Sequence, residues 1–125
     1  MSSPTIHGGS AAASSGEKIS VKKAEGKDAY TVAEIYEKKS SLSEKQVVVR
    51  GKVVKVSSGI MGKNWIHLQD GTGSKLDGTN DIIATSQDSP EVGEVVTVKG
   101  TVYKDKDFGS GYKFSVIMEQ ASVQK

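Results

Sequence analysis

An aromatic ring, an imidazole and an amide stand at alternate positions of one short stretch in the middle of the chain. Trp65, His67 and Gln69 are separated by the apolar residues Ile66 and Leu68. Because successive side chains of a strand point to opposite faces, this alternation predicts a strand with Ile66 and Leu68 in the core. The other three side chains would then form one exposed row. Such a row indicates a binding surface, although its residue types do not identify the ligand.

The residues give little support to other kinds of chemistry. The chain has no Cys, which excludes disulfides, thiolate metal sites and thiol catalysis. His67 is the only His of the expected folded part, and Asp70 falls on the opposite strand face, so no metal site is expected. No Ser, His and acid are spaced as a nucleophilic triad requires. The DGTG and GSG stretches at 70–73 and 109–111 lack the following helix and Lys of a phosphate loop. We therefore expect a non-enzymatic protein without a cofactor.

Composition divides the chain into a tail and one domain. The first residues are rich in Ser, Ala and Gly and the next are charged, so we expect 1–29 to be a disordered tail or linker. The stretch after Met1 looks like an added linker, in which case a signal peptide or upstream domain is missing from this sequence. Net charge is +2 for 125 residues, too small to predict nucleic-acid binding by itself. No apolar run approaches the roughly 20 residues that span a bilayer.

Residues 30–125 begin with a helix signal and continue as strands. Thr31 and Glu34 have the spacing of a capping box, which predicts one short helix over Val32–Lys39 that closes one end of a barrel. The apolar phase changes beside Gly51, which predicts a bent first strand that serves two sheets. Short turns separate the expected strands, which are Val47–Val56, Asn64–Gln69, Asp81–Ser86, Glu94–Lys104 and Tyr112–Ser122. This pattern predicts an all-β domain, a small five-stranded closed barrel.

Four runs of sequence resemble one known fold family. VRGKVVKV, IMGKNWIHLQDGTG, VGEVVTVKGTV and KDFGSGYKFSVIME are similar to the oligonucleotide/oligosaccharide-binding (OB) fold. More narrowly, they resemble bacterial OB-fold nucleic-acid-binding domains of the tRNA-anticodon-binding-like type. The nearest of these are modules of exported or lipid-anchored bacterial proteins, some of them associated with nitrite-reductase operons. The resemblance covers about Tyr30 to Val123 and implies an OB-type β-barrel with one short N-terminal helix, in an exported or periplasmic protein. The connection Gln87–Gly93 departs from the family because it is too short for the usual helix, and the N-terminal helix is expected to take that place.

The resemblance also implies where a ligand binds. OB folds bind across strands two and three, between the loops that follow strands one and four. Aromatic side chains there stack on bases, and cations pair with phosphates. The candidate ligand-binding residues are Lys55, Lys63, Trp65, His67, Gln69, Lys104, Lys106, Phe108, Tyr112 and Lys113.

Two functions stay open at this level. The first is binding of single-stranded nucleic acid or a related oligomeric ligand by a monomer. The alternative is an exported protein–protein or small-ligand module that binds no nucleic acid. Asp105 and Asp107 alternate with lysines and make the last loop nearly neutral, which weakens electrostatic attraction of a strand. Trp65 likewise has two interpretations, a stacking platform or a packing residue covered by a neighbouring loop.

Overall fold

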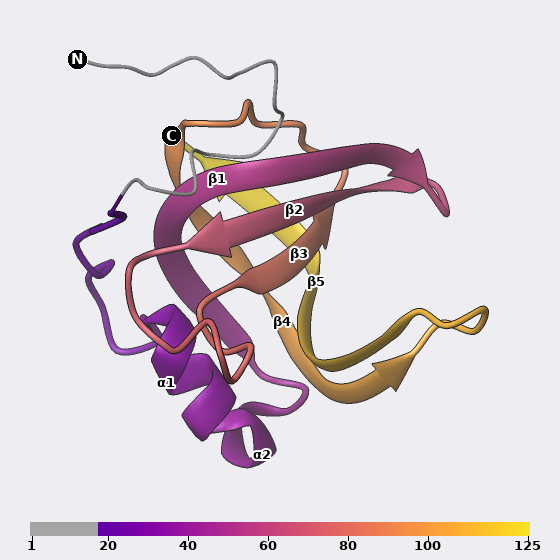
Figure 1. Cartoon of the computed structure of the whole chain (residues 1–125), viewed down its shortest axis with the longest axis horizontal. Helices are drawn as coiled ribbons and strands as arrows, with labels where there is room; N and C mark the ends of the chain where they lie inside the picture. The colour runs from indigo at the N-terminus through magenta and orange to yellow at the C-terminus, as the bar shows by residue number, and fades with distance from the viewer. Residues whose placement is uncertain (1–17) are drawn as a thin grey trace.

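The computed structural model describes residues 18–125 and is mainly β (Figure 1). Residues 1–17, the first part of the expected tail, lie outside the described range. No helix in the described range is long and apolar enough to cross a membrane. The elements in chain order are α1 (Val32–Glu37), α2 (Lys39–Leu42), β1 (Gln46–Ile60), β2 (Lys63–Gln69), β3 (Ile82–Ser86), β4 (Val95–Asp107) and β5 (Lys113–Gln124).

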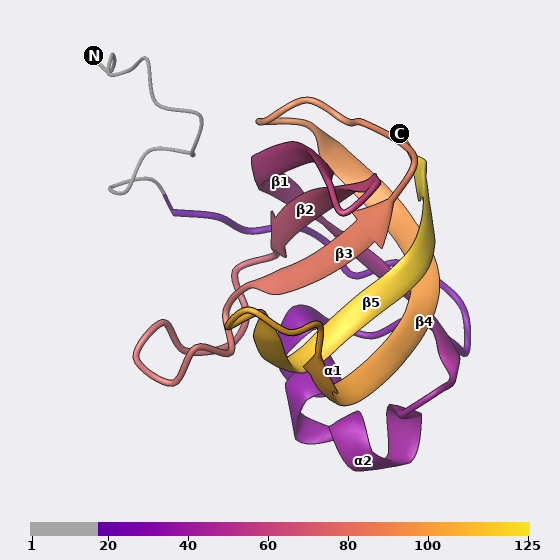
Figure 2. The ribbon, with the colours of Figure 1, turned by 90° about the vertical axis from the view of Figure 1, so that its right-hand side faces the viewer.

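The five strands form a sheet that closes on itself in the order β1-β2-β3-β5-β4. Only β3 and β5 run parallel; the other neighbours are antiparallel. Closure depends on the curvature of β1, which pairs with β4 through its first half and with β2 through its second (Figures 1 and 2). Lys52, beside Gly51, pairs with both neighbours. The first strand therefore has two partners, as the phase change predicted, but both belong to one closed sheet. The register shift lies just beyond Lys52, between Val53 and Lys55.

The core lies inside the closed sheet and at the end that α1 covers. Ile66 and Leu68 are fully buried, as the alternation predicted. Val32 and Ile35 of α1 join the same cluster, so the helix closes one end of the sheet (Figure 2). The single helix expected over Val32–Lys39 is wrong in detail, because the backbone leaves helical geometry at Lys38 and resumes in α2.

The DGTG turn after β2 holds the start of α1. Asp70 is buried, and its Oδ2 accepts the Val32 N–H at 2.9 Å. Thr72 Oγ1 accepts the Ala33 N–H at 3.0 Å and donates to Asp70 Oδ1. The predicted capping box is present: the Thr31 N–H donates to Glu34 Oε1, and the Glu34 N–H donates to Thr31 Oγ1. All four N–H groups of the helix start are thus bonded within the chain, and none is left for an anion.

Residues 18–29 lie against the domain without forming a strand. The Val21 N–H donates to the Asp70 carbonyl at 3.1 Å. Ala29 is buried and forms an isolated bridge with Val48 of β1. The end of the expected tail is therefore attached to the closed sheet.

Two expected loops are largely strand. β1 continues to Ile60, so the loop expected over Ser57–Lys63 shrinks to a turn at Met61 and Gly62, both with positive φ. β4 continues to Asp107 and pairs with β5 in a two-stranded extension, here called the hairpin arm (residues 104–116). The arm curves away from the closed sheet in Figure 1. The loop prediction failed there because alternating Lys and Asp resemble a loop in sequence, whereas backbone pairing holds them in a ribbon.

Candidate ligand-binding face

Four aromatic side chains from β2 and the hairpin arm gather on the outer face of β2. Trp65 is the central member, and its ring centroid lies 5.3 Å from that of Phe108 in an edge-to-face arrangement. Tyr112 stacks on Trp65 at 5.9 Å, and Phe114 lies 5.7 Å away. We call these four residues the aromatic cluster. Since three of them belong to the hairpin arm, the cluster fixes the arm against β2.

Trp65 is covered by this packing, so the prediction that it is exposed is wrong. Only 5 % of its surface is accessible, and its indole N–H donates to the Ile60 carbonyl at 2.8 Å. The face was predicted correctly, since Trp65 points away from the core cluster that contains Ile66. Of the two interpretations, the structure favours packing beneath a neighbouring segment. Tyr112 is the most exposed member of the cluster, with 40 % of its surface accessible, whereas Phe108 and Phe114 are half-buried.

Two of the candidate lysines border the aromatic cluster. Lys63 Nζ lies 5.0 Å from the Phe108 ring centroid and 5.8 Å from that of Trp65. Lys106 Nζ lies 5.6 Å from the Phe108 centroid. Both ammonium groups form ion pairs with Glu119 of β5, at 3.2 Å and 3.4 Å. The cluster therefore has a cationic border that one carboxylate partly neutralises.

His67 and Gln69 lie together but belong to a separate hydrogen-bond group. His67 Nδ1 lies 3.0 Å from Asp81 Oδ1, and Gln69 Nε2 donates to Asp81 Oδ2 at 3.2 Å. The Tyr36 hydroxyl donates to the Asp81 carbonyl at 2.6 Å. Burial, and secondarily the Asp81 charge, raises the pKa of Tyr36 to about 12. These contacts orient His67 and Gln69 along the strand, so they are held in place before any ligand arrives.

The remaining candidate lysines do not join the aromatic cluster. Lys104 Nζ donates to Ser40 Oγ of α2 at 3.3 Å, which directs it toward the helical end of the domain. Lys55 is exposed on β1 opposite His67. Lys113 is exposed at the start of β5. The structure thus brings together Lys63, Trp65, Lys106, Phe108 and Tyr112 and leaves the other candidates around them.

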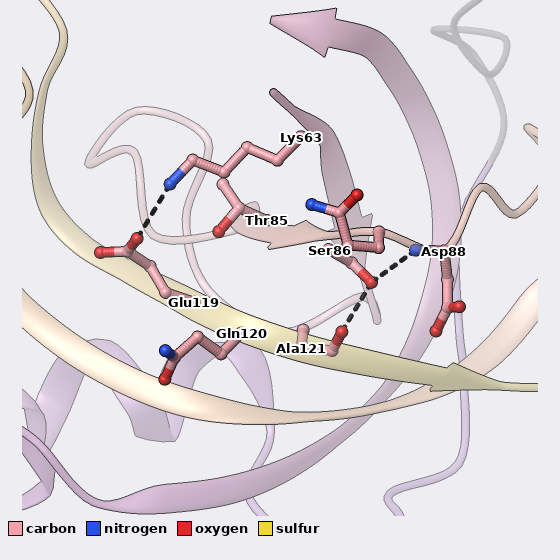
Figure 3. Close-up of a pocket in the computed structure, with 8 residues that line it drawn as sticks. Lys63, Thr85, Ser86, Asp88, Glu119, Gln120 and Ala121 are labelled. Carbon is pink, nitrogen blue, oxygen red and sulfur yellow. Dashed lines mark hydrogen bonds and ion pairs between the residues drawn. The ribbon is translucent and has the colours of Figure 1, made fainter. Parts of the chain in front are cut away.

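A cleft of about 440 Å³ adjoins the cluster where β3 and β5 separate (Figure 3). These two strands pair only at two positions, with a register shift between them. The Ser86 hydroxyl donates to the Ala121 carbonyl at 2.6 Å and accepts the Asp88 N–H at 2.9 Å, which ties the strands together at one end of the cleft. Lys63 and Glu119 form another part of its lining.

Sequence reasoning missed two acids that organise this face. Asp81 precedes β3 and binds two of the predicted residues. Glu119 is 8 % exposed and contacts Lys63 and Lys106, the two lysines that border the aromatic cluster. The sequence did contain a clue to Glu119, since it is the only acid in the expected strand Tyr112–Ser122. Buried charges are usually paired, so an acid within an apolar strand predicts a cationic partner.

Comparison with known proteins gives no relative: no protein family, curated protein or solved structure matches the chain. Within residues 18–125, no group of three or more His, Asp and Glu side chains could hold a metal ion.

Proposed function

We propose that residues 30–125 are an OB-type barrel that binds single-stranded nucleic acid, or a related oligomeric ligand, without catalysing a reaction. The strand order supports this fold, since β1 pairs with both β2 and β4, and β3 runs parallel to β5. A five-stranded barrel with oligomer-binding loops after strands one and four has this organisation. The sequence runs that resemble the OB family fall on these strands. Because fold does not determine function, the ligand is argued from the face itself.

The aromatic cluster carries the proposal. Tyr112 presents an exposed ring that is backed by the buried Trp65, so the ring is held in place before binding. A base can stack on such a ring, and stacking tolerates any sequence. Lys63 and Lys106 lie at the border, where phosphates of a bound strand would pass. Since the aromatic surface is already ordered, binding would cost little conformational entropy.

The charges indicate modest affinity. Asp105 and Asp107 lie on the arm beside Lys106. Glu119 forms ion pairs with both lysines that border the aromatic cluster. Few phosphates would be neutralised, so the affinity should fall with salt along a shallow slope.

Titration of oligo-dT and oligo-U at low salt tests the proposal. We expect chemical-shift changes within 63–69 and 104–113. Trp65 fluorescence should change as well, because a base stacked on Tyr112 alters the surroundings of the indole behind it. Tyr112→Ala should cost about 1–3 kcal/mol of binding, the usual worth of one stacked base. Tyr112→Phe is the matched control, because it keeps the ring and should keep the affinity. Trp65→Ala should mainly lower stability, because the indole is packed.

An exported protein–protein or small-ligand module, acting as a monomer, is the second candidate. Ile60 and Met61 at the β1–β2 turn are 36 % and 48 % exposed and lie on the side that holds Trp65. Exposed apolar side chains at a turn that contacts the Trp65 indole suit a protein partner. The exported location that the sequence resemblance implies favours the same candidate. If neither oligonucleotide causes a shift at low salt, the nucleic-acid proposal is refuted and this candidate replaces it.

A further inference from the structure

We propose that Lys63 and Lys106 form the site for one phosphate of the bound strand, and that Glu119 fills this site in the free protein. The inference rests on the proposed function. The inference adds an internal competitor to that function: a carboxylate that the phosphate must displace from the two ammonium groups.

The geometry of the ion pairs supports this assignment. Glu119 Oε1 lies 3.2 Å from Lys63 Nζ, and Oε2 lies 3.4 Å from Lys106 Nζ. The lysines come from β2 and from the hairpin arm, so the carboxylate bridges the two segments that form the binding face (Figure 3 shows the Lys63 side). A phosphodiester likewise shares one negative charge between two non-bridging oxygens, and each can accept from one ammonium group. The pair of lysines is therefore spaced for a bridging anion.

The carboxylate of the ion pairs is more buried than the two lysines, as competition with a ligand from solvent requires. The Glu119 side chain is 11 % exposed, whereas those of Lys63 and Lys106 are 25 % and 39 % exposed. The two lysine side chains are thus more open to a ligand from solvent than the carboxylate that bridges them. Glu119 Oε2 is buried and accepts no hydrogen bond from the described residues, so its contact with Lys106 is purely an ion pair. Two cations against one anion leave one positive charge for a ligand.

The site adjoins the stacking surface. Phe108 lies under both ammonium groups, and Phe108 and Tyr112 pack on the same indole. A nucleotide stacked on Tyr112 therefore has this lysine pair close to its phosphate. The neighbouring Asp107 is used within the arm, where its Oδ1 accepts the Gly109 N–H at 2.7 Å.

Glu119→Gln tests the proposal, because it keeps the shape of the side chain and removes its charge. We expect the affinity for oligo-dT at low salt to rise about tenfold, a typical cost of one unfavourable charge contact. The plot of log affinity against log salt should also steepen, by at most about 0.7, because the lysine pair then neutralises its phosphate without opposition from a carboxylate. Glu94→Gln is the matched control, because Glu94 pairs with Lys125 instead, and it should leave both quantities unchanged.

The outcomes separate this inference from the proposed function. Equal affinity of Glu119→Gln and the unmodified chain overturns the internal competitor and leaves nucleic-acid binding intact. Failure of both proteins to bind overturns both proposals. Binding by Glu119→Gln alone supports the competitor and refutes nucleic-acid binding by the unmodified chain. If the variant binds inorganic phosphate or poly-glutamate as tightly as oligo-dT, the assignment of the site to a nucleic-acid strand is overturned.

A second measurement covers the case in which Glu119→Gln does not fold. In the unmodified chain, saturation with oligo-dT should change the ¹³C chemical shift of the Glu119 carboxylate, since its ammonium partners turn to the phosphate. The Glu94 carboxylate should not change. An unchanged Glu119 signal at saturation overturns the proposal.

Discussion

Removal of the Asp70 carboxylate should destabilise the domain strongly, although Asp70 lies in a surface turn. The side chain is 3 % exposed and accepts three hydrogen bonds, from the N–H of Val32, the N–H of Thr72 and the hydroxyl of Thr72. The bond from the Val32 N–H joins the turn after β2 to the start of α1, across 38 residues of sequence, while the two bonds from Thr72 hold the turn itself. The turn therefore stabilises a long-range contact.

The magnitude follows from the donors left behind. Asp70→Ala leaves the N–H of Val32, a fully buried residue, without an acceptor, and an unsatisfied buried donor costs about 1–3 kcal/mol. The N–H and hydroxyl of Thr72 lose the same carboxylate, which adds about 1 kcal/mol, the net worth of a typical hydrogen bond. We therefore expect Asp70→Ala to lower the free energy of unfolding by about 3 kcal/mol. Asp70→Asn keeps one amide oxygen as an acceptor and should cost about half as much.

Urea unfolding followed by Trp65 fluorescence measures the effect, because Trp65 loses its packed environment when the sheet opens. Asp77→Ala and Asp77→Asn are the matched controls, since Asp77 is exposed in the loop that follows the same turn. They should change the unfolding free energy by less than about 0.5 kcal/mol. If the Asp70 and Asp77 variants have the same midpoint and slope, the helix start does not depend on Asp70 and the reasoning is refuted.

Two further predictions concern the curved strand and the helix. A Cβ at Gly51 would lie 3.2 Å from the Gln69 carbonyl oxygen, so Gly51→Val should lower the unfolding free energy by about 1 kcal/mol or more; an unchanged thermal midpoint would contradict this. Because the pKa of Tyr36 is raised to about 12, its neutral form stabilises the fold below pH 10, and this contribution is lost as pH rises from 10 to 12. Ultraviolet titration should show one of the four tyrosines ionising near pH 12, a step absent in Tyr36→Phe, and its persistence in the variant would refute the assignment.

Local rules were enough to predict the five strands in their order and the core face of β2, although not where every element ends. Alternation identified Ile66 and Leu68 as core residues because a strand repeats every two residues wherever it lies. The capping box at Thr31 was readable because its two hydrogen bonds join residues three apart. The phase change beside Gly51 indicated the shared first strand, since a closed sheet needs one strand to turn between two partners.

The sequence by itself thus determined which face of β2 each side chain occupies, but only the tertiary structure decided what lies on the outer face. Trp65 points outward as predicted, yet it is buried, because the hairpin arm brings Phe108 and Tyr112 across from a distant part of the chain. Glu119 meets Lys63 by the same route, through contacts between segments more than fifty residues apart. Periodicity reports the direction of a side chain relative to its own strand. It contains no information about which other segment packs there, and that packing sets the exposure and charge of the proposed binding face.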